Sequence, residues 1–400
     1  MRRFCIDSSY LGTPRHIIGD PEGYQWSDSV PRDSWHFTGE TKNSRCLDTL
    51  FKLVGHQPAE VAPRYITAMN NLVTGSISVP IPWMHAVPQD EFRIFFKNLI
   101  QGTMDVFSEL PFEYCEGPWT AGGRVLSALK PAKIDPVSLQ EEIDSQGSNS
   151  NVLEGFRPKR SGFAHLPVYD RFSTRTGRLT ITEGPNILVL KKGARRIIQS
   201  SFEGGAICYL DFRALEARIV LAEAGRYSSA EDMYAEMAEG LFGGRLSRDA
   251  VKTAVIAELY GISRASLRLR LGVDDRTLDS FIGTIRSHFG LEELQKRLEK
   301  EYEETGGKIN NRFGRPLQIP PGHKNLLINT YAQSTGVDVS MLGFDSVIRS
   351  LGPEGIRPLF VLHDAIILDV RNDRLHEVSS MKHVPIPTYE QPFLLKYEIL

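Results

Sequence analysis

Apolar and polar positions divide the chain into a weakly patterned first fifth and a more strongly patterned remainder. Residues 1–85 are predicted to be irregular, and residues 46–54 are the clearest helical candidate among them. The Pro-rich segment 79–88 indicates a boundary. Beyond it, apolar residues recur at helical spacing in residues 91–110, which predicts a longer helix.

The pattern after residue 200 alternates between strand and helix. Residues 206–211 form an apolar run that predicts a buried strand, and residues 216–224 predict the helix that follows. Residues 230–304 read as almost wholly helical, with breaks at Gly243-Gly244, Gly261 and Gly272 and an N-cap at Ser247. Further on we expect a hairpin at 308–319, a helix at 329–349, and a second hairpin formed by 358–362 and 365–370.

Composition places the chain among globular proteins of ordinary type. Its 400 residues are 41% hydrophobic and 24% charged, enough for two or three domains. No apolar run approaches the length of a membrane span, and no apolar stretch follows Arg2-Arg3, so we expect neither a membrane partner nor a signal peptide. The four cysteines are scattered without a Cys-x-x-Cys pair, which favours a reducing cytoplasm over zinc or a disulfide framework.

Basic residues gather in one segment although the net charge is only −2. Residues 157–196 contain ten Lys or Arg residues against Asp170 and Glu183. Such a local excess suits a phosphate backbone. A solvated basic face explains the same pattern equally well.

Two acidic residues each lie where an apolar strand meets a turn. Asp211 ends the predicted strand 206–211, and Asp364 lies in the turn of the second hairpin. Two carboxylates brought together there can hold two Mg²⁺ ions about 4 Å apart, with positions left open for phosphates. Either aspartate taken alone is better explained as a helix cap or turn residue.

A stripe of four residues accompanies these acids on one predicted helix. Arg248, Lys252, Ile256 and Tyr260 recur every four residues and therefore share one helical face. The two cations can bind the charged tail of a triphosphate, and the tyrosine offers a flat ring to a base or sugar. The alternative is a solvated cationic helix face.

These segments together resemble the polymerase motifs of family A DNA polymerases, the DNA polymerase I family. The resemblance covers about residues 176–364, roughly half of the chain. It is carried by Thr176-Gly-Arg178-Leu, Asn186, Gly193-Ala-Arg-Arg196, residues 211–218, residues 248–261, Gly314-Arg-Pro, Asn329-x-x-x-Gln333-x-Thr335 and His363-Asp364.

The resemblance implies roles for individual residues. Asp211 and Asp364 look like the catalytic metal-binding acids, holding two Mg²⁺ ions for which Mn²⁺ is expected to substitute. Arg248 and Lys252 look like the catalytic clamp on the triphosphate. The implied nucleotide-binding residues are Phe212, Glu216, Ile256, Tyr260 and Gly261. The implied DNA-binding residues are Arg178, Arg195, Arg196, Asn329, Gln333 and His363.

Glu216 bears on the choice between DNA and RNA synthesis. It follows Asp211 by five residues, just over one helical turn, and we expect its side chain to lie under the nucleotide sugar and to hydrogen-bond to Tyr260. A bulky acid there leaves no room for a 2′-hydroxyl, whereas the related single-subunit RNA polymerases have a small residue at this place. Elsewhere such a residue would be interpreted as a solvent-facing helical glutamate.

The chain also departs from the family pattern. Ile256 stands where the family usually has Phe or Tyr, and Ala365 replaces the usual acid after the second metal ligand, which leaves a two-carboxylate centre. The segment before the core is too short for the family's proofreading exonuclease domain. Its single Asp-x-Glu, Asp20-Pro21-Glu22, is interpreted as a turn because proline is poorly tolerated in a central strand.

The resemblance therefore implies an α+β right-hand polymerase fold with an antiparallel-sheet palm. We expect an N-terminal region of unknown role at 1–85, a reduced helical thumb at 86–155, palm segments at 156–225 and 306–400, and helical fingers at 226–305. The expected partners are primer–template DNA and deoxynucleoside triphosphates, with a separate exonuclease or processivity factor as a further possibility. Two alternatives stay open: an RNA-synthesising relative, and a catalytically idle nucleic-acid-binding subunit of the same fold.

Overall fold

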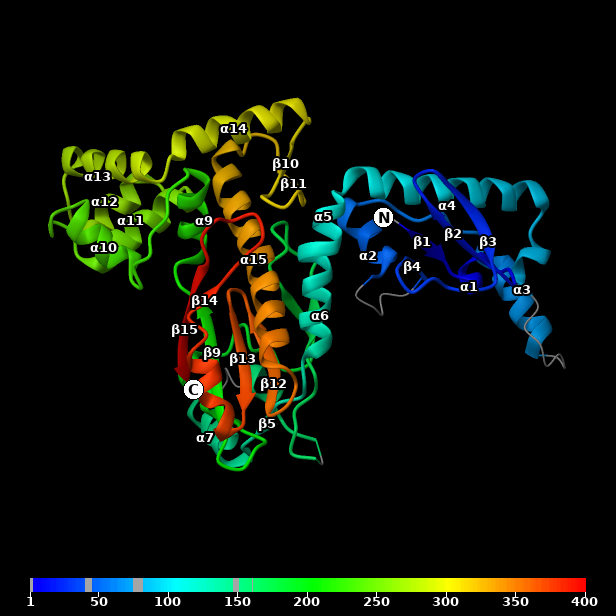
Figure 1. The fold of residues 1–400 in the computed structure, drawn as a ribbon, viewed down its shortest axis with the longest axis horizontal. Coiled ribbons are helices and arrows are strands. Elements are labelled where there is room, and N and C mark those ends of the chain that lie inside the picture. Colours follow the sequence, from blue (N-terminus) through cyan, green and yellow to red (C-terminus); the bar gives the residue numbers. More distant parts are fainter. Residues whose placement is uncertain (1–2, 40–44, 75–81, 147–150, 160) are drawn as a thin grey trace. The chain divides into compact units, whose positions relative to one another are not determined.

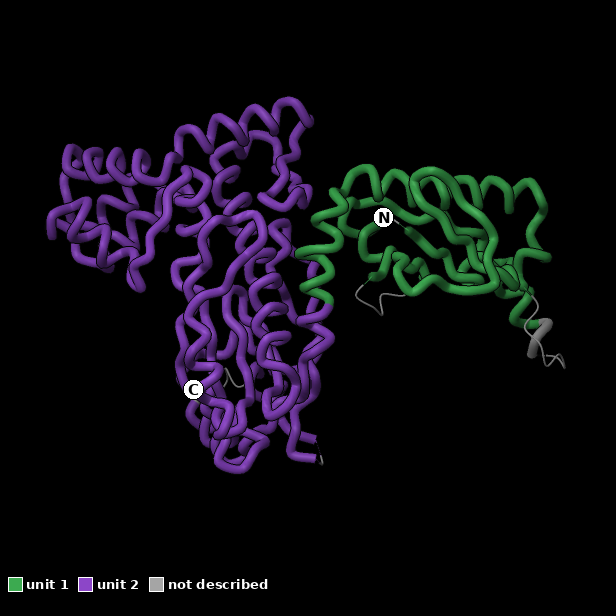
Figure 2. The backbone as a smooth tube through the Cα atoms, in the orientation of Figure 1, with its two compact units in different colours: residues 1–123 green, residues 124–400 purple. Residues whose placement is uncertain are grey.

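The computed structural model of the chain describes residues 3–39, 45–74, 82–146, 151–159 and 161–400. The backbone forms two compact units, residues 1–123 and residues 124–400 (Figure 2). Residues 79–81 of the predicted boundary segment and residues 147–150 of the predicted thumb segment lie outside the described residues. Among the described residues, no helix has both the length and the apolar character needed to cross a membrane.

The first unit contains a four-stranded sheet in the order β3-β2-β1-β4. Its strands are β1 Phe4–Ile6, β2 His16–Asp20, β3 Gly23–Ser27 and β4 Trp35–Phe37. β1 pairs antiparallel with β2 and parallel with β4. The prediction that residues 1–85 are irregular is therefore wrong. Strands of three to five residues are too short to produce a recognisable alternation of apolar and polar positions.

Helices complete the first unit around this sheet. They are α1 Ser8–Leu11, α2 Leu47–Val54, α3 Pro63–Thr74, α4 Gln89–Glu109 and α5 Phe112–Tyr114. The helices predicted at 46–54 and 91–110 are confirmed as α2 and α4. The ring of Phe107 in α4 lies 6.4 Å from that of Phe4 in β1, and both side chains are buried. α4 therefore packs within the N-terminal unit.

The Asp20-Pro21-Glu22 sequence forms the turn between β2 and β3, as predicted. The Asp20 carboxylate accepts hydrogen bonds from the backbone N–H groups of Glu22, at 2.9 Å, and Gly23, at 3.2 Å. This arrangement is an Asx-type turn, in which the acid stabilises its own loop.

The second unit is built on a five-stranded antiparallel sheet in the order β12-β13-β9-β15-β14 (Figure 1). The strands are β9 Ala206–Phe212, β12 Ile356–Leu362, β13 Ala365–Val370, β14 His383–Val384 and β15 Phe393–Ile399. β9 and the β12–β13 hairpin confirm two predictions. Three two-stranded ladders accompany the sheet: β5 Lys133–Ile134 with β8 Ile198–Gln199, β6 Val168–Asp170 with β7 Thr180–Glu183, and β10 Lys308–Asn310 with β11 Pro316–Gln318.

The central strand β9 alternates between two apolar environments. Cys208, Leu210 and Phe212 join a buried cluster that includes residues of the long helix α15, Leu327–Leu351. Ile207 and Tyr209 point to the other face and join a second cluster. Because side chains alternate along a strand, Asp211 lies on the face of Tyr209. It is the last residue of that face before α9 begins.

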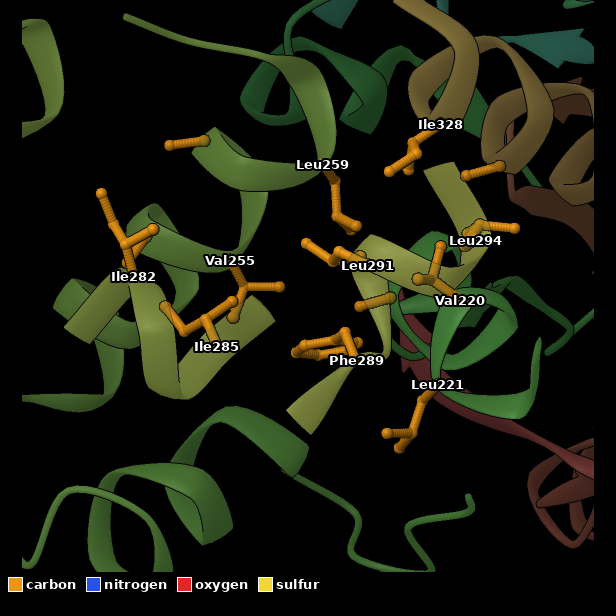
Figure 3. Packing of buried hydrophobic residues seen from close by; sticks show 14 of the residues in the cluster. Val220, Leu221, Val255, Leu259, Ile282, Ile285, Phe289, Leu291, Leu294 and Ile328 are labelled. Atoms are coloured by element: carbon orange, nitrogen blue, oxygen red, sulfur yellow. The ribbon is translucent and has the colours of Figure 1, made fainter. Parts of the chain in front are cut away.

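Helices α9–α14 form one continuous helical body. Their bounds are α9 Leu215–Glu223, α10 Met233–Gly240, α11 Arg248–Tyr260, α12 Arg264–Leu271, α13 Asp275–His288 and α14 Leu291–Glu304. Figure 3 shows Val255 and Leu259 of α11 among apolar side chains of neighbouring helices. Each such buried side chain contributes about 1.5–3 kcal/mol. The helical prediction for 230–304 is confirmed, and α11 is thereby fixed against α9.

The division between the two compact units falls within the predicted thumb segment 86–155. α4 and α5 belong to residues 1–123, whereas α7 Pro136–Gln146 and α8 Asn151–Glu154 belong to residues 124–400. α6 Thr120–Ala128 spans the division. α16 Leu375–Ser379 completes the second unit. The mixed α+β class with an antiparallel sheet is confirmed, and the domain names stay predictions.

Candidate active site

Asp211 and Asp364 are brought together by pairing of β9 with β13. Asp211 lies directly opposite Ala365 in the antiparallel register, so Asp364 is one residue away across the ladder. The backbone N–H of Phe212 donates to the carbonyl oxygen of Asp364 at 2.9 Å, which holds the two strand ends together. Residues that are 153 positions apart in the sequence thus border the same cleft.

The surroundings of both carboxyl groups oppose their ionisation. Burial raises the pKa of Asp211 to about 7, the neighbouring Asp364 carboxylate adds to this increase, and the Lys396 ammonium opposes it. Burial also raises the pKa of Asp364 above its ordinary value. A divalent cation would stabilise both carboxylates. Their oxygen-only donor chemistry fits Mg²⁺, which is usually held by one or two carboxylates together with water and phosphates.

A residue with a strained backbone lies three positions after Asp211, and another lies directly before Asp364. Ala214, which precedes α9, has φ +49°, and His363, which precedes Asp364, also has φ +49°. Thr388 is the third non-glycine residue with positive φ among those the structure describes. Such conformations cost about 1–3 kcal/mol each and persist where the surrounding fold enforces them. The turns that place the two acids are therefore held by the sheet and by α9.

Helix α11 presents its predicted stripe to the same cleft. Arg248, Lys252, Ile256 and Tyr260 border it, together with Asp211 and Asp364. The cleft has a volume of about 480 Å³, within the range of about 300–1,000 Å³ that is typical of small-molecule sites. The Ser247 hydroxyl caps the helix by accepting from the Ala250 N–H at 3.2 Å. The structure thus brings a carboxylate pair and a cationic helix face to one cavity.

The two cations on this stripe have different partners. Arg248 donates to Asp232 at 2.9 Å and to Asp249 at 2.7 Å. The side chain of Lys252 is exposed, and within the part of the chain that the structure describes no acidic group forms an ion pair with it. Lys252 therefore offers the more available positive charge to an anionic ligand.

Glu216 is held between a tyrosine and an arginine. Its carboxylate accepts from the Tyr260 hydroxyl and from Arg178 Nη2, the latter at 2.6 Å, and Arg178 also lies 3.4 Å from the Tyr260 hydroxyl. Burial and the Glu216 carboxylate raise the pKa of Tyr260. The predicted hydrogen bond between Glu216 and Tyr260 is present. The pairing of Glu216 with Arg178 was not predicted.

Gln333 and His363 lie beside this group, whereas Asn329 does not. Gln333, His363 and Asp364 border a small hollow that Arg178 and Glu216 also line. Asn329 lies one turn earlier in α15 and borders neither cavity. Its Oδ1 is buried and has no hydrogen-bond partner among the described residues.

Two predicted nucleotide-binding residues have positions that limit their contacts. The Phe212 ring is 2% exposed and packs 5.6 Å from the Phe344 ring in the core, so only its backbone can face a ligand. Gly261 ends α11 with φ +70°, and a Cβ added there would approach the Asn325 carbonyl oxygen to 3.3 Å. Its conformation and this close approach both favour glycine.

Much of the basic segment 157–196 is already paired within the protein. Ion pairs join Arg157 to Glu154, Arg178 to Glu216, Lys192 to Glu398, and Arg196 to Glu142. Arg195 lies over the Tyr209 ring at 5.5 Å and does not border the cleft. Arg160 lies outside the described residues. DNA binding by Arg195 and Arg196 stays a prediction, and these pairs reduce the charge available for it.

Lys396 is a cleft residue that sequence reasoning missed. It lies on β15 directly opposite Asp211 in the register and lines the cleft. Asp232, the N-cap of α10, was also missed although it binds Arg248. The capping position of Asp232 was a detectable signal. Nothing in the local sequence around Lys396 indicated that β15 would pair with β9.

Known proteins with similar sequences or folds include DNA polymerases. No family model matches the chain. It is 25% identical over 306 residues to "DNA polymerase I, thermostable" of Thermus filiformis, covering 69% of this chain and 34% of that protein. It is 24% identical over 316 residues to the corresponding protein of Thermus aquaticus, covering 71% of this chain and 38% of that protein. The chain thus spans little more than a third of the length of these relatives.

A solved structure extends the similarity to the whole fold. The POL domain of Pol1 from M. smegmatis, in complex with DNA primer–template and dNTP, matches 100% of this chain and 95% of its own length, with a TM-score of 0.56 and 13% identity. The fold is therefore that of a DNA polymerase POL domain. The chain is thus similar in sequence to the named DNA polymerase I proteins and similar in fold to a POL domain.

Proposed function

We propose that this chain is a template-directed DNA polymerase that adds deoxynucleotides to the 3′-hydroxyl of a primer and releases pyrophosphate. One observation carries the proposal: Asp211 and Asp364 share a cleft with the Arg248, Lys252 and Tyr260 face of α11. Acids for a metal and cations for a triphosphate are the parts that phosphoryl transfer needs, since its catalysis is mostly positioning and charge stabilisation.

Each side chain has a proposed task in this reaction. Asp211 and Asp364 would hold the divalent cations, which when bound lower the pKa of the attacking hydroxyl and neutralise charge on the leaving group. Lys252 and Arg248 bind the triphosphate tail, and Lys252 donates a proton or positive charge to the departing pyrophosphate. Tyr260 stacks on the base or sugar. Glu216 fills the space beside the sugar that a 2′-hydroxyl would need.

The domain assignment follows from these tasks. We propose that the five-stranded sheet belongs to the palm, because it carries both acids, and that helices α10–α14, within residues 226–305, are the fingers, because α11 carries the triphosphate face. Primer–template DNA is the proposed partner. The thumb is proposed to lie within residues 86–155, where α7 and α8 belong to the same unit as the sheet.

Primer extension with acid variants tests the central proposal. Asp211→Asn and Asp364→Asn should each reduce extension by at least a thousandfold, because several kcal/mol of transition-state stabilisation are lost and each 1.4 kcal/mol is a factor of ten. Primer–template affinity, measured by fluorescence anisotropy, should change little. Near-normal extension by either variant would remove the metal-site assignment.

The nucleotide used by the wild-type chain separates the proposal from its alternatives. Efficient extension with deoxynucleotides and weak extension with ribonucleotides supports a DNA polymerase. The reverse preference would establish an RNA-synthesising relative. Tight primer–template binding without extension by either nucleotide would establish an idle nucleic-acid-binding subunit.

We also propose that the chain does not proofread. The Asp20 carboxylate is occupied by hydrogen bonds within its own turn. With Mg²⁺ and no nucleotides, a mismatched primer should therefore remain intact. Trimming by the wild-type chain that disappears in Asp20→Ala would overturn this part of the proposal.

A further inference from the structure

Asp211 is flanked by unlike neighbours on the two strands that pair with β9. Ala365 of β13 lies opposite it on one side, and Lys396 of β15 lies opposite it on the other. Directly opposed residues on adjacent strands point to the same face of the sheet. The acid that would bind a cation therefore has a methyl group on one side and an ammonium group on the other.

The ammonium group is held in place by Glu398, two residues further along β15. Lys396 and Glu398 form an ion pair, and Glu398 also accepts a hydrogen bond from Lys192. The contacts with Lys192 and Lys396 lower the pKa of Glu398. Glu398 is thus ionised and matched by two lysines. Because one carboxylate serves both, the positive charge of Lys396 is only partly neutralised.

Lys396 lines the cleft in addition to pairing with Glu398. It borders the cleft together with Asp211, Asp364 and the α11 face. Its side chain is 45% exposed, so it is not a core lysine fixed by burial. Asp211 faces it directly in the register between β9 and β15.

We propose that Lys396 is a positioning residue of the active site: its ammonium group acts as a built-in cation beside Asp211 and Asp364 and lowers their affinity for a divalent metal ion. The proposal rests on the assignment of these two acids as the metal site under the proposed function. The physical basis is repulsion between the ammonium group and a divalent cation held by Asp211, the residue opposite Lys396. Ala365, which lies opposite Asp211 on β13, carries no charge and so does not offset this repulsion.

A surface lysine that merely stabilises the sheet is the alternative. An exposed pair such as Lys396 and Glu398 is typically worth about 0–1 kcal/mol of stability. Such a role predicts a small change in the unfolding midpoint and no change in metal affinity. The two interpretations therefore differ in a quantity that can be measured on the protein without DNA or nucleotide.

Mn²⁺ titration of the full chain, followed by electron paramagnetic resonance of the free ion, provides that measurement. Lys396→Gln should tighten Mn²⁺ binding by about tenfold, and Lys396→Glu should tighten it further, as expected from Coulomb's law for one charge near a divalent ion. Lys396→Arg keeps the charge and should bind Mn²⁺ as the wild type does. Lys300→Gln is the matched control, because it removes an exposed lysine of α14 and should leave Mn²⁺ affinity unchanged.

The same titration on Asp211→Asn separates the two proposals. Loss of the Mn²⁺ site in Asp211→Asn, with equal affinity in the wild type, Lys396→Gln and Lys396→Glu, would overturn the role of Lys396 and leave the metal site standing. Unchanged Mn²⁺ binding in Asp211→Asn would instead overturn the metal assignment itself, and this inference with it. Equal tightening by Lys396→Arg and Lys396→Gln would mean that side-chain shape acts rather than charge, which also overturns it.

Discussion

The two sides of the cleft are built from different kinds of structure. The acids are attached to neighbouring strands whose register is fixed by six residue pairs between β9 and β13, and the carboxyl of Asp211 is largely buried. The cations are attached to one exposed face of a single helix, α11, where Arg248 donates hydrogen bonds to Asp232 and Asp249. One side is fixed by backbone pairing and the other by side chains at the surface.

This difference indicates how the two sides respond to a ligand. Backbone hydrogen bonds and burial leave the acids little freedom, so their geometry exists before any ligand binds. Long, exposed side chains can leave one partner for another, since surface ion pairs contribute little stability. We infer that the cationic side chains of α11 rearrange when a ligand binds, whereas the two acids keep the same geometry with and without a ligand.

Lys252→Ala is expected to have the largest effect among changes on the helical side. The Lys252 charge has no acidic partner among the described residues, so a triphosphate would meet it directly. Removing a group that stabilises charge developing in the transition state costs about 100- to 1,000-fold in the rate of the chemical step. Single-turnover incorporation at saturating deoxynucleotide measures it, and primer–template affinity should remain within a factor of about two to three.

Arg248→Ala provides the comparison with Lys252→Ala. Arg248 must release Asp232 and Asp249 before it can bind a phosphate. Removing Arg248 should therefore reduce the incorporation rate less than removing Lys252 does. Lys300→Ala, a lysine outside the cleft, is the charge-matched control. Equal losses for Arg248→Ala and Lys252→Ala would contradict the distinction between a paired and an available cation.

Glu216→Ala should act on the choice of sugar more than on the rate. The side chain fills space beside Tyr260 and Arg178, and its removal opens room for a 2′-hydroxyl. We expect the ratio of kcat/KM for deoxy- over ribonucleotides to fall by at least about tenfold, equivalent to 1.4 kcal/mol. Glu216→Gln keeps the volume and should keep most of the ratio.

The control for this change is Glu239→Ala, which removes an exposed helical glutamate from α10. An unchanged ratio in Glu216→Ala would mean that another residue guards the sugar. The preference for DNA over RNA synthesis would then lose its main support from this chain.

The two units differ in how far the sequence predicted their folds. β9 and the β12–β13 hairpin were predictable because each strand is an apolar run bounded by turn residues, and α11 because its four-residue spacing lies between the Ser247 cap and Gly261. The sheet of the first unit was not predictable, because strands such as Phe4–Ile6 and Trp35–Phe37 are three residues long. Their stability comes from pairing and from aromatic packing against α2 and α4, which no local pattern reveals.

The same limit applies within the active site. Asp211, Lys252 and Tyr260 could be selected because spacing along one strand and one helix already places them. Lys396 could not, since it reaches the cleft only through the pairing of β15 with β9. The ion pair between Arg178 and Glu216 likewise joins residues from a loop and a helix. Local order was predictable from the residues, and contacts made by strand pairing or between side chains of distant segments were not.

Substitutions of His363 are expected to have the smallest effect, and they test whether the backbone before Asp364 is strained. With φ +49°, His363 lies in the left-handed region of backbone conformation, which costs a residue with a Cβ about 1–2 kcal/mol. His363→Gly should therefore be more stable than His363→Ala by about 1 kcal/mol, a difference in unfolding midpoint of roughly 2 °C. In a helix or strand interior the order is reversed, and glycine is the less stable residue. Differential scanning fluorimetry on both variants measures the difference, and because both remove the imidazole, any loss of its contacts cancels. A higher midpoint for the alanine variant would show that the hairpin relaxes without penalty, and the contrast between a fixed acid side and an adaptable cationic side would lose this part of its support.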